Sequence, residues 1–185
     1  MFHASKTDLP LGFEVPPYDL PSRVPNAFAV YIEAIASGPD SAVRLVRAMT
    51  EGGSYSGGAL LIEARAEQLR QAEFADRPRR FDCTFGLRTL AEAINYSAMY
   101  HGAQHVFEVE LIGEPETLCG DFGLITVGFD DASLPSVAMA ALDTRLRAYW
   151  QTMTEDLASA PPGWEVLVVG RLRVTSGCLT QPAHP

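Results

Sequence analysis

Residues 81–112 read FDCTFGLRTLAEAINYSAMYHGAQHVFEVELI, and this stretch decides the kind of fold that the chain can adopt. Residues 81–87 indicate a strand. Thr89 and Glu92 match a capping box, in which each side chain accepts the backbone N–H of the other residue, so a helix is expected to begin there. Residues 104–112 then alternate apolar and acidic side chains with the period of a half-buried strand. The expected order is strand, capped helix, strand.

The flanking sequence adds strands and helices in an irregular order. Residues 7–25 are rich in proline and are expected to form an extended loop. Asn26 and Asp40 are expected to cap the first two of four further helices, at residues 27–37, 41–51, 59–74 and 133 to about 158. Further strands are expected at residues 1–5, 124–129 and 164–174. Because regular βαβ alternation is missing, the predicted class is α+β, with one domain over residues 1–185 and a helical insertion at about 26–75.

The bulk composition restricts where the chain can act. The formal net charge is −9, and Lys6 is the only lysine among 14 basic residues, so the surface would repel a phosphate backbone. No apolar run approaches the ~18 residues that span a membrane, and no export signal is visible, so a cytoplasmic location is expected. Cys83, Cys119 and Cys178 are odd in number and lack CxxC spacing, which predicts free thiols and no metal site.

Two short patterns have some features of known binding motifs. The glycine-rich segment 52–58 lacks the Lys-Ser/Thr of a phosphate-binding loop, and it is interpreted as a flexible linker. His101 and His105 have the spacing of a zinc-binding pair. Gly102 lies between them at an expected helix end, however, so the two imidazoles should not share a helical face. Structural or surface histidines are expected instead.

Two clusters of charged residues also stand out in the sequence. Arg77, Arg79 and Arg80 could form a local basic patch, but a solvated loop before a strand is the preferred interpretation. Glu108 and Glu110 lie on one face of a strand, a spacing that suits acid/base work and matches the E-x-E signature of arginine-modifying toxins. Alternating glutamates also simply face solvent on a half-exposed strand, so both interpretations stay open.

Three separated pieces occur in an order that resembles ADP-ribosyltransferases of the poly(ADP-ribose) polymerase and rifampin ADP-ribosyltransferase type. The pieces are FHAS at residues 2–5, TFGLRTLAEAINY at 84–96 and GWEVLVVGRLRV at 163–174. Together they resemble the family's H-Y-E triad in an H-F-E version, formed by His3, Phe85 and Glu165. The wider sequence also resembles a bacterial family of uncharacterised proteins grouped with these enzymes. The resemblance implies a split mixed β-sheet core with flanking helices.

The resemblance further implies that the chain binds NAD as a substrate, releases nicotinamide and transfers ADP-ribose to a protein, nucleic acid or small molecule. His3 would hydrogen-bond a ribose hydroxyl. Glu165 would bind the ribose 2′-hydroxyl and stabilise the cation that develops on the sugar. The remaining residues would bind nicotinamide. The Ala4 backbone and the Ser5 hydroxyl would bind its amide, and Phe85 and Tyr96 would stack on its ring.

Two positions depart from the family pattern, and three alternatives remain. Ala4 replaces a glycine, and Phe85 replaces a tyrosine, keeping the stacking face but losing the hydroxyl.

Asp121 is a rival for the catalytic role, because the rifampin-modifying enzymes carry an aspartate in a comparable region. An arginine-modifying enzyme centred on Glu108 and Glu110 is the enzymatic alternative. The non-enzymatic alternative is an NAD-binding or protein-interaction module with a degenerate pocket.

Overall fold

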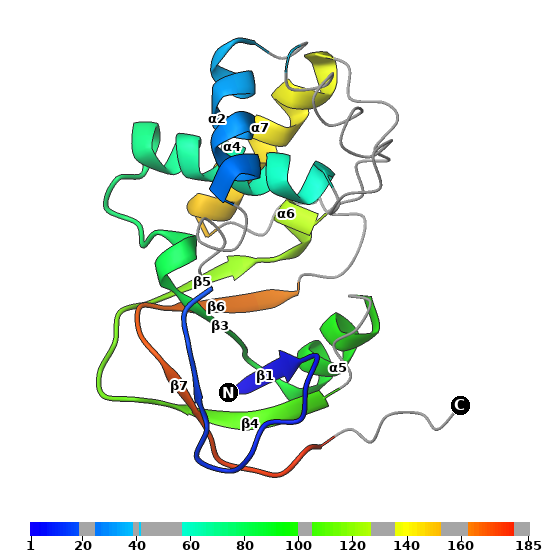
Figure 1. Cartoon of the computed structure of the whole chain (residues 1–185), viewed down its shortest axis with the longest axis vertical. Coiled ribbons are helices and arrows are strands. Elements are labelled where there is room, and N and C mark those ends of the chain that lie inside the picture. Colours follow the sequence, from blue (N-terminus) through cyan, green and yellow to red (C-terminus); the bar gives the residue numbers. More distant parts are fainter. Residues whose placement is uncertain are drawn as a thin grey trace. The chain divides into compact units, whose positions relative to one another are not determined.

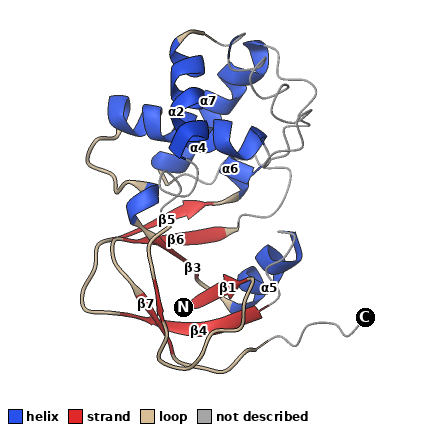
Figure 2. Ribbon diagram, viewed as in Figure 1, coloured by secondary structure: helices blue, strands red, loops and turns tan. Residues whose placement is uncertain are grey.

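The computed structural model describes residues 1–18, 25–38, 41, 57–99, 105–126, 136–152 and 163–179. Helices and strands are both present (Figure 2), so the predicted α+β class is confirmed. The chain divides into two compact units. The sheet unit comprises residues 1–18, 78–120 and 163–185, and the helical unit comprises residues 19–77 and 121–162.

The sheet has seven strands in the order β2–β7–β4–β1–β3–β6–β5 (Figure 1). The strands are β1 (Phe2–Ser5), β2 (Glu14–Val15), β3 (Thr84–Leu87), β4 (His105–Leu111), β5 (Thr117–Asp121), β6 (Trp164–Val168) and β7 (Leu172–Val174). The first strand of the chain, β1, pairs antiparallel with β3 on one side and with β4 on the other. The prediction of a strand at residues 1–5 is confirmed, and the structure adds that this strand is central in the sheet.

The stretch that decides the fold differs from its prediction only at the ends of its strands, since β4 ends at Leu111, one residue before the predicted end. The predicted strand 81–87 begins at Thr84, because the residues before it form the short 3-10 helix η1 (Arg80–Asp82). The capping box is confirmed, since the Thr89 N–H donates to the Glu92 carboxylate at 2.8 Å and the Glu92 N–H donates to the Thr89 hydroxyl at 3.2 Å. Helix α5 (Leu90–Met99) follows directly.

Both faces of the sheet carry apolar side chains. On the face covered by α5, a buried cluster and its partly buried neighbours consist of Phe2, Ala4, Leu87, Ala93, Tyr96 and Val106. The buried cluster on the other face consists of Val15, Phe107, Val109, Val168, Leu172 and Val174. The alternation predicted for β4 is confirmed inside the strand, where Phe107 and Val109 are buried and Glu108 and Glu110 are exposed, whereas Leu111 at its end is 38% exposed.

The prediction of one closing strand at residues 164–174 is wrong, because the segment forms two strands in different parts of the sheet. β6 pairs with β3, whereas β7 pairs with β4 and with β2. Gly170 separates β6 from β7 and has a φ of 153°, a value that glycine adopts much more readily than other residues. The proline-rich segment 7–25 likewise contributes a short strand, since Val15 of β2 pairs with Leu172 of β7.

The region around Asp121 also differs from the prediction. Residues 117–121 form β5, which the sequence did not indicate, and Asp121 is the last residue of that strand. The expected strand 124–129 begins as the short helix α6 (Gly123–Thr126), and residues 127–129 lie outside the described part. The Asp121 carboxylate accepts the Gly123 N–H at 2.8 Å, a local bond that turns the chain out of the extended conformation.

The helical unit contains α2 (Pro25–Ala36), α4 (Gly57–Glu73), α6 and α7 (Ser136–Trp150), and α4 contacts each of the others. The apolar face predicted for α4 is confirmed for its described side chains, since Leu61, Ala64 and Leu69 are buried. The predicted linker 52–58 is wrong at its end, because its last two residues belong to α4. α2 begins at Pro25, one residue before the expected cap. The helix expected after Asp40 lies outside the described residues, apart from Ser41.

Helix α7 ends earlier than expected. It stops at Trp150, and the turn after it contains Thr152 with a φ of 59°, whereas the sequence predicted a helix to about residue 158. Residues 153–162 lie outside the described part. Among the helices that the structure describes, none is long and apolar enough to cross a membrane.

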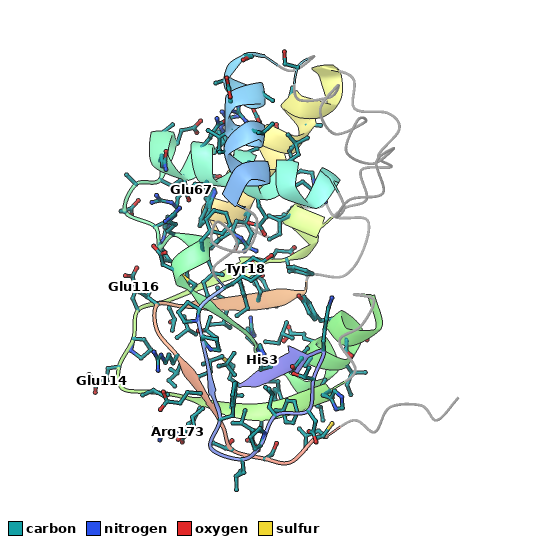
Figure 3. All side chains as sticks on the ribbon, in the orientation of Figure 1. His3, Tyr18, Glu67, Glu114, Glu116 and Arg173 are labelled. Carbon is teal, nitrogen blue, oxygen red and sulfur yellow. The ribbon has the colours of Figure 1, made fainter. Side chains whose placement is uncertain are left out.

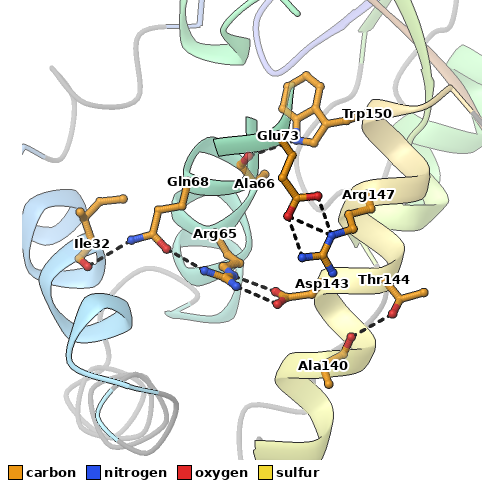
Figure 4. A network of polar contacts seen from close by, with 10 residues as sticks. All are labelled: Ile32, Arg65, Ala66, Gln68, Glu73, Ala140, Asp143, Thr144, Arg147 and Trp150. Carbon is orange, nitrogen blue, oxygen red and sulfur yellow. Dashed lines mark hydrogen bonds and ion pairs between the residues drawn. The ribbon is translucent and has the colours of Figure 1, made fainter. Parts of the chain in front are cut away.

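Polar contacts connect the helices of the helical unit (Figure 4). The Arg65 guanidinium donates two hydrogen bonds of 2.7 Å to the carboxylate of Asp143, which joins α4 to α7. Arg147 binds the Glu73 carboxylate in a similar way, at 2.7 Å. The indole N–H of buried Trp150 donates to the Ala66 carbonyl at 3.0 Å. Each of these bonds lies between α4 and α7.

Candidate functional site

The three pieces of the H-F-E pattern lie on adjacent strands. β1 carries His3, β3 carries Phe85 and β6 carries Glu165, and the sheet order places these strands side by side as β1–β3–β6. Phe2 of β1 lies opposite Leu87 of β3, which in turn lies opposite Glu165. Residues far apart in the sequence therefore lie on neighbouring strands, with Phe85 on the strand between those of His3 and Glu165.

The register also determines the face to which each side chain points. Residues directly opposite each other on paired strands share a face, and successive residues of a strand alternate. Phe2, Leu87 and Glu165 consequently share one face, and Phe85 shares it because it lies two residues before Leu87. His3 follows Phe2 and belongs to the other face. The sheet brings the three strands together but does not align all three triad side chains.

His3 is attached to β3 through the backbone. Its Nδ1 atom lies 2.9 Å from the Phe85 carbonyl oxygen, and Figure 3 shows the side chain beside β1. β1 and β3 pair at a single position, Phe2 with Leu87, so the imidazole is an additional link between the two strands. Burial lowers the pKa of His3, and the bond to Phe85 opposes this to a smaller extent. The neutral imidazole therefore donates Nδ1–H to the carbonyl, which leaves Nε2 as an acceptor.

Glu165 is a buried carboxylate with a cationic partner. The residue is 3% exposed on an interior strand, and the Arg80 guanidinium forms an ion pair with it. The same guanidinium lies over the Phe85 ring, 4.8 Å from the ring centre. The Tyr18 ring contacts Phe85 edge-on, at 5.3 Å between ring centres. Arg80, Phe85, Glu165 and Tyr18 thus form a compact polar and aromatic cluster, here called the Arg80 cluster.

The expectation of a solvated loop is wrong for Arg80, which is 4% exposed. The arginine enters the interior because η1 turns the chain just before β3 and because a buried carboxylate needs a partner. Its neighbour Arg79 behaves as expected, with a side chain that is 40% exposed. The sequence signal that separates the two arginines is weak, since both stand in the run DRPRRF.

The remaining residues of the predicted NAD site have local structural contacts. Tyr96 is partly buried on α5 and packs, like Ala4, against the apolar cluster around Leu87. The Ser5 hydroxyl accepts the Thr7 N–H at 3.1 Å in an exposed turn at the end of β1. These contacts position Tyr96 and Ala4 on the α5-covered face and Ser5 at the strand end.

The rival carboxylates have different surroundings. Glu108 and Glu110 lie exposed on β4, and Glu110 is 3.3 Å from a guanidinium nitrogen of Arg173. Asp121 is 1% exposed and belongs to the helical unit, where its carboxylate accepts the N–H of Gly123. Of these three carboxylates only Asp121 is buried.

The described residues include no cluster of His, Cys, Asp or Glu that could hold a metal ion. The predicted free thiols are confirmed. Burial raises the pKa of Cys83 to about 12, so this thiol stays protonated at neutral pH. The Cys178 sulfur lies 3.5 Å from Nδ1 of His105, and no third ligand joins this pair among the described residues.

No protein-family model matches the chain, and no curated protein sequence matches it significantly. The resemblance to ADP-ribosyltransferases therefore depends on the three motif pieces themselves.

Proposed function

We propose that the sheet unit binds NAD and that the chain transfers ADP-ribose to an acceptor, with release of nicotinamide. The observation that supports this proposal is the adjacency of β1, β3 and β6, the strands that carry His3, Phe85 and Glu165. If the three short matches had arisen independently, there would be no reason for the segments that carry them to be neighbours in one sheet.

The chemistry fits a carboxylate beside an aromatic ring. Cleavage of the bond between nicotinamide and ribose leaves positive charge on the sugar, and negative charge fixed near that point lowers the barrier. In the proposal, Glu165 supplies this charge and Phe85 supplies a face for the nicotinamide ring. His3 would bind a ribose hydroxyl through Nε2 as the resemblance implies, although its side chain belongs to the face of the sheet opposite Phe85 and Glu165. Ala4, Ser5 and Tyr96 would complete the nicotinamide site as the resemblance implies.

The test is incubation of the purified chain with labelled NAD and a lysate, with nicotinamide release and label transfer both measured. Glu165→Gln should reduce turnover by about 10²-fold or more, the loss expected for one transition-state electrostatic contact, while NAD affinity changes only a few-fold. Asp121→Asn is the rival and should change turnover far less. The reverse ranking would assign the catalytic role to Asp121. The acceptor of ADP-ribose in this proposal is a protein, a small molecule or a nucleic acid. The net charge of −9 disfavours binding of a nucleic acid.

Two further variants test the arginine-modifying alternative. Glu108→Gln and Glu110→Gln should leave turnover unchanged if the proposal holds, because both carboxylates are exposed on β4. A large loss in either variant, together with an unaffected Glu165→Gln variant, would favour an E-x-E enzyme.

A second candidate function is an NAD-binding or protein-interaction module without catalysis. It is favoured by the pairing of Glu165 with Arg80 and by the position of His3 on the other face of the sheet. NAD should then raise the melting temperature by mass action without any release of nicotinamide. In either case we expect a cytoplasmic location, since three cysteines outside disulfides suit a reducing compartment.

A further inference from the structure

We propose that Arg80 controls access to the nicotinamide site, because its guanidinium occupies the place that the nicotinamide riboside cation of NAD would take between Phe85 and Glu165. This inference rests on the proposed NAD-binding function and adds a competitor from within the chain. It concerns a residue that the H-F-E pattern does not include.

The contacts of Arg80 are those that the proposed ligand would make. A planar cation lies over the face of the Phe85 ring, 4.8 Å from its centre, and donates a hydrogen bond to Glu165. The nicotinamide ring of NAD⁺ is also planar and positively charged, and the ribose attached to it carries hydroxyl donors. Cations are attracted to aromatic faces, and carboxylates accept hydrogen bonds from both guanidinium and hydroxyl groups.

The burial of the pair makes the two occupants mutually exclusive. Arg80 is 4% exposed and Glu165 is 3% exposed, so a ligand cannot reach the carboxylate while the guanidinium remains in place. Displacement of Arg80 would not leave Glu165 as an unpaired buried charge, because the incoming ligand brings its own positive charge. The apparent affinity for NAD is then reduced by the fraction of molecules in which Arg80 covers the site.

The 3-10 helix that carries Arg80 also presents side chains to solvent. The side chains of Arg79 and Asp82 in the same turn are 40% and 63% exposed. In the proposal, the Arg80 guanidinium moves toward this solvent-facing side of the turn by a change of side-chain rotamers, and β3 and β6 stay folded.

The experiment compares Arg80→Met with Arg79→Met, and NAD binding is measured by calorimetry. Arg80→Met retains an unbranched apolar stem but lacks the competing cation, so NAD should bind about 10-fold more tightly or better. Arg79→Met should bind NAD like the unmodified chain. Because Arg80→Met removes the ion pair with Glu165, the double variant Arg80→Met/Glu165→Gln is compared with Glu165→Gln in the same way, and circular dichroism verifies that each variant is folded.

A second measurement distinguishes competition from a general effect on stability. In Arg80→Ala, ethylguanidinium should refill the vacated place and raise the dissociation constant for NAD, whereas it should leave NAD binding to the unmodified chain unchanged. Equal NAD affinities for Arg80→Met, Arg79→Met and the unmodified chain would overturn the proposal and make Arg80 a purely structural partner of Glu165. Weaker binding in Arg80→Met would also overturn it. Absence of NAD binding in the unmodified chain and in every folded variant would contradict the proposed function itself.

Discussion

Charged side chains are used differently in the sheet unit and in the helical unit. In the sheet unit, Arg80 and Glu165 are almost completely buried beside Phe85. In the helical unit, Arg147 and Glu73 pair at the surface, with side chains that are 41% and 38% exposed. Both pairs join elements distant in sequence, but only the first has given up its hydration. Such a pair is costly to bury and weak as a source of stability, so its retention is more informative about function.

The largest effect should come from disruption of the buried pair. Arg80→Met removes the ion pair of the buried Glu165 carboxylate with Arg80 and should lower the free energy of unfolding by about 3–5 kcal/mol. Urea denaturation measures this change. The double variant Arg80→Met/Glu165→Gln removes both charges and should recover most of the loss. If the double variant is as unstable as the single one, the ion pair is not the reason for the destabilisation.

An intermediate effect is expected from the buried indole of the helical unit. Trp150→Phe removes the hydrogen bond to the Ala66 carbonyl and leaves a small void, which should cost about 1–3 kcal/mol. Trp164→Phe is the control in the sheet unit, because Trp164 is only partly buried. A larger loss of unfolding free energy for Trp164→Phe than for Trp150→Phe would contradict the expectation that the buried indole contributes more to stability than the partly buried one.

A smaller, pH-dependent effect should come from His3. Burial lowers the pKa of the folded-state imidazole below its ordinary value of 6.5, so between these two values the unfolded chain binds more protons than the folded chain. The stability conferred by neutral His3 is complete above pH 6.5 and is lost as the pH falls toward the lowered pKa. In His3→Gln, the free energy of unfolding should decrease less between pH 7 and 5 than in the unmodified chain. Identical slopes would show that His3 is not buried in the neutral form.

The smallest effect is expected for the exposed pair. Arg147→Gln removes a surface ion pair whose members remain hydrated, and the midpoint of urea denaturation should stay close to that of the unmodified chain. Addition of salt should shift the midpoint of urea denaturation equally in Arg147→Gln and in the unmodified chain. A loss similar to that of Arg80→Met would remove the contrast between the two units.

The sequence determined those features that depend on neighbouring residues. The capping box at Thr89 and Glu92, the buried alternation at Phe107 and Val109 and the apolar side of α4 all follow from bonds or periodicities within a few residues. The α+β class follows from the order of such segments. Even the early strand β1 was evident, although its partners were not.

The tertiary structure decided which of these segments meet and which charges are buried. Gly170 divides the apolar run 164–174 into β6 and β7, which join different neighbours in the sheet, and hydrophobicity alone does not reveal that division. Arg79 and Arg80 are the same residue type side by side, yet only Arg80 is buried, because a carboxylate 85 positions later lies opposite it. Strand pairing across such separations depends on the whole sheet, so the face of His3 and the partner of Glu165 could be determined only from the fold.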